Sequence, residues 1–150
     1  MKTPKHGKSG LRALLRAATD LHGHFGPFLA LGIRMGLLGL RELSVQQGDR
    51  RMTATVMLEY AVPFSCILDG IQISTRCTVG NARLAWKESN EIGAIFQLDS
   101  SQQRVEIWVL PVVIRELKRR LAKQPSDEEI RQVGLDISSR SDSELFLSKR

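Results

Sequence analysis

Apolar residues at helical spacing open the chain and predict two successive helices. Ser9 is the expected N-cap of the first helix, which runs to about Thr19. Its apolar stripe recurs every three or four residues and consists of Leu11, Leu14, Leu15 and Ala18. The second helix is expected to begin at Pro27, whose missing N–H is harmless in a first turn, and to run to about Leu43.

Between residues 51 and 60 the apolar positions recur every second residue, which predicts a half-buried strand. Polar residues there alternate with apolar ones, namely Met52, Ala54, Val56, Leu58 and Tyr60. Pro63 ends this strand. Ser65 is then the expected N-cap of a short helix that runs from Cys66 to about Thr75.

The second half of the chain predicts more strands and then two helices. Short polar turns join three strand candidates into an antiparallel meander, at residues 83–87, 92–98 and 104–110. Pro111 opens an amphipathic helix that runs to about Lys123. A capping box, Ser126 with Glu129, starts another helix, and Gly134 is expected to stop it.

Helices that bracket such strands predict an α+β fold. The sheet is expected to be antiparallel, a meander plus one earlier strand, with helices packed around it. A length of 150 residues suits a single domain over residues 1–150. About eight residues at the N-terminus are expected to form a basic, flexible arm.

The net charge of +6 brings nucleic-acid binding into question, but we do not expect it. Part of the excess lies in the N-terminal arm. The rest has the pattern of a solvated helix face and comes from Arg115, Lys118, Arg119, Arg120 and Lys123. No recognition motif accompanies this charge, and no apolar stretch suits a bilayer span or a secretory signal. We therefore expect a cytoplasmic protein with neither nucleic acid nor membrane as a partner.

Candidate chemistry appears first where His22 and His24 flank Gly23, just before the second predicted helix. Residues two apart in an extended loop point to the same side, so both imidazoles can face one ion. The alternative is a purely structural loop, in which one ring donates a hydrogen bond to a backbone carbonyl and the other is exposed to solvent.

A second candidate is the predicted helix that begins at Cys66. Backbone N–H groups and the helix dipole in a first turn stabilise a thiolate and lower its pKa. Asp69 and Gln72 share one face of this helix with Cys66, and Cys77 follows just beyond its end. Imidazole and thiolate together favour zinc or another late first-row metal. The alternative is that both thiols are packed in the core.

Two stretches, "HGHFGPFLALGIRMG" and "CILDGIQISTRCTVGNARL", together resemble the signatures of the formylmethanofuran dehydrogenase E-type subunit family. The resemblance covers roughly residues 15–110, and "DSELF" at 142–146 is similar to the close of the family's core domain. It implies an α+β core and a homodimer. Gly32 and Gly36, four residues apart, offer a helix face that another backbone can approach closely.

The resemblance also implies the site residues. The implied metal ligands are His22, His24, Cys66 and Cys77, and the residues that orient them are Asp69, Gln72 and Thr78. Two departures stand out. Gly26 occupies a position where the family commonly has a cysteine, and Arg76 replaces the usual glycine before the second cysteine. No paired-cysteine zinc finger follows the core.

The sequence therefore predicts a metal-binding domain, with zinc or another divalent transition metal as the cofactor. The resemblance implies a role as an accessory to molybdenum or tungsten one-carbon redox metabolism, as in methanogens, with redox-enzyme subunits as partners. Two other functions stay open: a stand-alone enzyme with a Cys66 or Cys77 nucleophile and a histidine base, and a non-catalytic dimeric interaction module. Whether the protein is an enzyme is not decided by the sequence.

Overall fold

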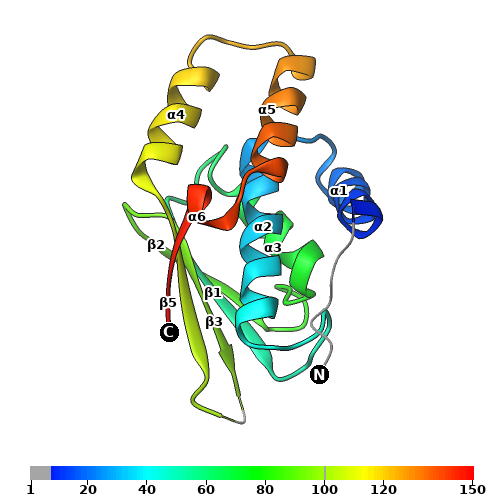
Figure 1. Cartoon of the computed structure of the whole chain (residues 1–150), viewed down its shortest axis with the longest axis vertical. Coiled ribbons are helices and arrows are strands. Elements are labelled where there is room, and N and C mark those ends of the chain that lie inside the picture. Colours follow the sequence, from blue (N-terminus) through cyan, green and yellow to red (C-terminus); the bar gives the residue numbers. More distant parts are fainter. Residues whose placement is uncertain (1–7, 100) are drawn as a thin grey trace.

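The computed structural model describes residues 8–99 and 101–150, and the expected N-terminal arm lies mostly outside them. Figure 1 shows the helices gathered on one side of a sheet. In chain order the elements are α1 (Lys8–His22), α2 (Pro27–Glu42), β1 (Met52–Leu58), α3 (Cys66–Thr75), β2 (Leu84–Glu88), β3 (Gly93–Leu98), β4 (Arg104–Val109), α4 (Pro111–Leu121), α5 (Asp127–Ser139), α6 (Asp142–Leu145) and β5 (Phe146–Lys149). The predicted α+β class is confirmed.

The sheet has five strands in the order β2-β1-β3-β4-β5. Neighbouring strands are antiparallel except β1 and β2, which are parallel. The meander therefore comprises β3, β4 and β5, whereas β2 pairs with β1 and not with β3. The reason is α3, which lies between β1 and β2 in the chain and provides the crossover that a parallel pair needs.

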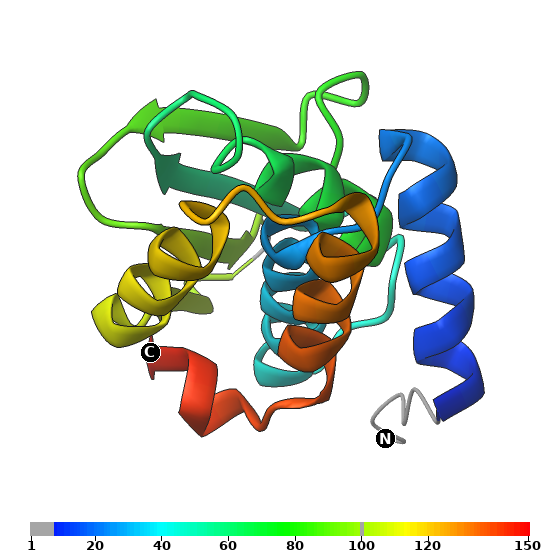
Figure 2. The same ribbon diagram turned by 90° about the horizontal axis from the view of Figure 1, so that it is seen from above.

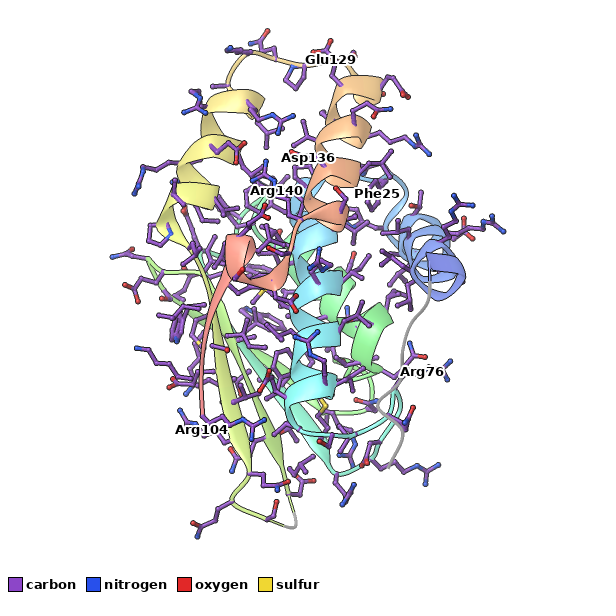
Figure 3. The ribbon with its side chains drawn as sticks, in the orientation of Figure 1. Phe25, Arg76, Arg104, Glu129, Asp136 and Arg140 are labelled. Carbon is purple, nitrogen blue, oxygen red and sulfur yellow. The ribbon has the colours of Figure 1, made fainter. Side chains whose placement is uncertain are left out.

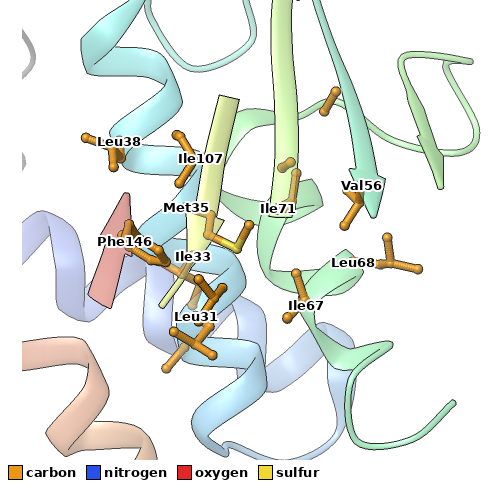
Figure 4. Packing of buried hydrophobic residues seen from close by; sticks show 14 of the residues in the cluster. Leu31, Ile33, Met35, Leu38, Val56, Ile67, Leu68, Ile71, Ile107 and Phe146 are labelled. Atoms are coloured by element: carbon orange, nitrogen blue, oxygen red, sulfur yellow. The ribbon is translucent and has the colours of Figure 1, made fainter. Parts of the chain in front are cut away.

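Helix α2 lies at the centre of the core, and its burial explains its nearly all-apolar sequence. All but four of its sixteen residues are buried. Figure 4 shows its side chains packed with those of α3 and the sheet, including Leu31, Ile33 and Ile67. A Cβ at Gly32 would strike the carbonyl oxygen of Ile67, and one at Gly36 would strike the Ser74 hydroxyl oxygen. The close backbone approach predicted at these glycines is confirmed, and the backbone that approaches is α3 of the same chain.

Three predicted helix signals differ from the structure. Ser9 lies inside α1, which already includes Lys8, and is therefore not its N-cap. Ser65 precedes α3, but its side chain makes no cap hydrogen bond. Gly134 lies inside α5 and does not end it. Glycine at position 134 serves close packing instead of helix termination, because a Cβ there would strike the Phe25 ring and the Gly26 backbone. Glycine thus lets α5 pack directly on the segment before α2.

The α4–α5 pair is joined by an ionic network on its outer surface. The Arg140 guanidinium donates to both Glu116 carboxylate oxygens, at 2.7 and 2.8 Å, and to Asp136 at 2.7 Å. Arg120 on α4 donates to the same Asp136 carboxylate at 2.9 Å. Figure 3 shows Asp136 near the end of α5 and Arg140 just after it. The predicted capping box of Ser126 and Glu129 is present at the other end of this helix.

Within the described ranges, every helix is too short or too polar to cross a membrane.

Candidate functional site

The candidate site lies where α1 ends and both α2 and α3 begin. His22 is the last residue of α1, His24 lies in the connection to α2, and Cys66 is the first residue of α3. All three line one cavity of about 350 Å³. The fold therefore brings together three of the four predicted metal ligands.

His22 is oriented by Asp69, one turn into α3. The His22 Nδ1 atom lies 2.6 Å from Asp69 Oδ2. Gln72 donates from its amide nitrogen to the other Asp69 oxygen at 3.1 Å, and its own carbonyl oxygen accepts from the Val79 N–H at 3.1 Å. Asp69 and Gln72 share one face of α3, as predicted from their spacing. Together they link the end of α1 to the loop that follows α3.

The second ring nitrogen of His22 has no protein partner. Nε2 is fully buried and makes no hydrogen bond. The contact with Asp69 fixes the tautomer, because a carboxylate accepts the proton that Nδ1 carries and leaves Nε2 with a free lone pair. The His24 ring lies beside it, with the two ring centroids 4.6 Å apart. A buried acceptor without a donor costs free energy unless a ligand satisfies it.

The Cys66 thiol is held in its protonated form, contrary to the prediction. Burial raises the pKa of the Cys66 thiol, the negative charge of Asp69 raises it further, and a backbone hydrogen bond lowers it by less. The predicted lowering by the helix start is therefore wrong. The side chain is only 8% exposed, and desolvation of the charged form exceeds the effect of the N–H groups.

Cys77 lies at the other end of α3. It follows the C-terminus of a ten-residue helix whose first residue is Cys66, which separates the two by about 14 Å along the axis. Its thiol donates to the Met52 carbonyl oxygen at 3.3 Å, and burial raises its pKa. Cys66 and Cys77 are thus not placed to share one ion.

Two neighbours of Cys77 also lie outside the cavity. The hydroxyl oxygen of Thr78 accepts from the Asn81 N–H at 3.1 Å, which belongs to the turn after α3. Arg76 is exposed, in the left-handed conformation that ends α3 (Figure 3). Arg83, and not Arg76, contributes the positive charge that lowers the pKa of Cys77, against the larger effect of burial.

The cavity also contains residues that the sequence did not indicate. The same space as His22 is also lined by Leu121 at the end of α4, by Gln124 and Pro125 in the connection that follows, and by Ile130 in the first turn of α5. No local motif marks them, because only the packing of α5 on the start of α2 brings this connection across the cavity. Figure 2 shows it passing from α4 to α5 above the N-terminal end of α2.

The donor set fits a metal ion in part. The unpartnered His22 nitrogen, a second imidazole and a thiol border one space, and these donors suit zinc. In the described part of the chain, no three His, Cys, Asp or Glu side chains are arranged to hold a metal ion as they stand. His24 is exposed, and its ring lies beside that of His22.

Two comparisons with known proteins bear on this site. The family model described as "FmdE, Molybdenum formylmethanofuran dehydrogenase operon" matches residues 21–147, which include His22, His24 and the whole of α3. A relative from Archaeoglobus fulgidus, named "Probable S-adenosyl-L-methionine-binding protein", is 35% identical over 79 residues. The match covers 53% of this chain and 22% of the relative, so the chain matches about a fifth of that protein's length.

Proposed function

Since this chain belongs to the FmdE family, whose model spans residues 21–147, we propose that it is a metal-binding domain. The ion is zinc or another divalent transition metal. Its ligands are His22, His24 and Cys66, and Asp69 orients His22. The family's description places its members with molybdenum formylmethanofuran dehydrogenase, and the proposed role is accessory to that redox chemistry, together with partner subunits.

The observation that carries this proposal is the buried Nε2 atom of His22. Its opposite ring nitrogen is bonded to the Asp69 carboxylate at 2.6 Å, while Nε2 has no partner. Metal-binding histidines almost always donate their other N–H to a carboxylate or carbonyl, which fixes the tautomer and raises the basicity of the ligating nitrogen. His22 has this arrangement.

Three protein ligands leave one tetrahedral position open, which is typical of catalytic zinc sites and not of structural ones. A bound ion would there polarise a carbonyl or activate water. Residues of the chain orient one ligand of this ion and shield another from solvent. Asp69 holds the His22 ring, and the buried position of Cys66 keeps its thiol away from solvent.

A stand-alone enzyme with a Cys66 nucleophile has less support. The raised pKa of Cys66 keeps its thiol protonated near neutral pH, and the thiolate is the reactive form. A metal ion lowers the pKa of a thiol that binds it, so the same burial is compatible with a ligand role. The name of the Archaeoglobus relative is not carried to this chain, because the match covers 22% of that protein.

Metal analysis of protein purified without an affinity tag tests the proposal. We expect close to one zinc per chain, and binding that weakens as the pH falls because protons compete for the ligands. His22→Ala and Cys66→Ser should each lose most of the metal. Asp69→Asn should weaken zinc affinity by about 10- to 100-fold, as for other residues that orient a ligand.

Cys77→Ser is the matched control for Cys66→Ser, since both thiols are buried and only Cys66 lines the cavity. We expect it to keep its zinc. His6, which lies outside the described residues, should also be dispensable. Equal metal content in the His22→Ala variant and the unchanged protein would contradict the proposal.

A further inference from the structure

The walls of the cavity beside His22 are apolar. They are formed by Phe28, Val62, Pro63, Leu121, Pro125 and Ile130. Apart from the two histidines and Cys66, Gln124 is the only polar side chain among the described residues that line it, and none of those residues is Asp, Glu, Lys or Arg. A charged group on a ligand would therefore find no oppositely charged side chain on these walls.

The size of the cavity restricts its occupant to a small molecule. Its volume of about 350 Å³ is near the lower end of the range for small-molecule sites, about 300–1,000 Å³. It is bordered by the stretch from the end of α1 to the start of α2, by the loop before α3 with Cys66, and by the stretch from the end of α4 to the first turn of α5. Figure 2 shows the α4–α5 connection above the start of α2.

The chemistry of the lining is divided between donor atoms and hydrocarbon. His22, His24 and Cys66 supply nitrogen and sulfur, whereas the end of α4 and the start of α5 supply hydrocarbon from Leu121 and Ile130. A molecule that fits both parts has a polar head that binds a metal and an apolar body that leaves water.

We infer that the ligand of this site is a small molecule with an uncharged apolar body and a metal-binding head, and that Leu121 and Ile130 select for the body. This inference rests on the proposed metal site, since the head binds the ion. It adds a specificity-determining role for two residues on α4 and α5 that lie outside the motifs of the metal site.

Two hydroxamates test the inference with the full chain loaded with zinc. Acetohydroxamate and benzohydroxamate carry the same metal-binding head and differ in their bodies, a methyl group against a phenyl ring. We expect benzohydroxamate to bind at least about tenfold more tightly, because an apolar wall discriminates by roughly this factor for each added group. Loading with cobalt gives a second readout, since each probe should change the visible absorption of the bound ion.

Two variants, Leu121→Ser and Ile130→Ser, assign the selectivity to the wall. Each should reduce the preference for benzohydroxamate several-fold and leave zinc content and acetohydroxamate affinity unchanged. The matched control is Val112→Ser, because Val112 also lies on α4 but is 57% exposed and does not line the cavity. It should keep the full preference.

The outcomes separate this inference from the proposed function. Absence of zinc from the unchanged protein would overturn both. Zinc binding with equal affinity for the two hydroxamates would overturn the inference alone and leave the metal site standing. If neither serine variant folds, the relative affinity of the unchanged protein for the two hydroxamates still tests the inference.

Discussion

At the scale of single residues, Gly26 offers a direct test of the metal site. It lines the cavity, and its extended backbone (φ −152°, ψ 179°) accepts any side chain. An added Cβ would lie 3.1 Å from the Ile130 Cγ2 atom, a flexible side chain that can move by a few tenths of an ångström. We predict that Gly26→Cys supplies a further thiolate and raises zinc affinity by about tenfold or more, measured by competition with a chelator.

Gly26→Ser is the control for that prediction, because it adds nearly the same volume without a thiol. It should leave zinc affinity close to that of the unchanged protein. A similar gain in both variants would mean that volume and not the sulfur is responsible.

Leu117 and Arg119 test the assignment of faces on α4. The Leu117 side chain is fully buried and Arg119 is exposed, as expected for an amphipathic helix. Leu117→Ala should reduce the free energy of unfolding by about 2–5 kcal/mol through the lost burial and the cavity left behind. Arg119→Ala should change it by less than about 0.5 kcal/mol. Chemical denaturation measures both, and similar values would show that the faces are misassigned.

At the scale of elements, the Arg140 network fixes how α4 and α5 lie together, and therefore where the cavity wall is. Hydrogen bonds from Arg140 hold the pKa of Glu116 and of Asp136 below their usual values. The unfolded chain thus takes up protons at a higher pH than the folded protein. The stability from this network is complete above the usual values of 4.5 and 3.8 and is lost as the pH falls through the lowered ones.

Replacing the arginine should remove this acid dependence. We predict that Arg140→Gln lowers the free energy of unfolding by about 1–2 kcal/mol near neutral pH. The difference from the unchanged protein should shrink as the pH falls through the lowered pKa values of Glu116 and Asp136, because both carboxylates then take up protons in the folded protein as well. Thermal unfolding at neutral pH and at a series of acidic pH values measures this. Arg119→Gln, on the same helix as Glu116 but outside the ion pairs formed among the described residues, should show no such change.

At the scale of the whole molecule, one face of the sheet is covered by helices and the other is not (Figure 2). The pairing registers align Lys87, Met57, Gly93, Trp108 and Leu147 in one row across the uncovered face, and this row is apolar from Met57 to Leu147. The Trp108 ring lies over Gly93, and Leu147 is 50% exposed. Gly32 and Gly36 of α2, by contrast, are already covered by α3. A homodimer, which family membership leads us to predict, is therefore expected to use this row.

Light scattering at micromolar concentration should report twice the chain mass. Leu147→Lys should yield monomers, because it places a charge in the apolar row. Val79→Lys is the matched control, since Val79 is as exposed as Leu147 but follows α3, away from the sheet. A monomer in the unchanged protein would contradict the prediction of a dimer.

The sequence by itself determined the kinds of the elements from α1 to α5 and most of their boundaries, whereas α6 and β5 were not predicted. The period of apolar positions and the residues typical of helix starts specify local structure. Pro27, Pro111 and the Ser126 capping box accordingly mark helix starts that the structure shares. The parallel pairing of β1 with β2 could not be predicted in this way. This pairing depends on where α3 returns the chain to the sheet, and that is decided by packing between segments distant in the sequence.

For the site, the sequence indicated the candidate residues, and the tertiary structure decided which of them meet. Spacing along one helix face placed Asp69 with Gln72, and the histidine pair at residues 22 and 24, together with the family resemblance, indicated His22. The position of Cys77 beyond the far end of α3, the raised pKa of Cys66 and the apolar wall from α4 and α5 came only from the fold. Burial and contact between distant segments set these properties, and neither is encoded in a local pattern.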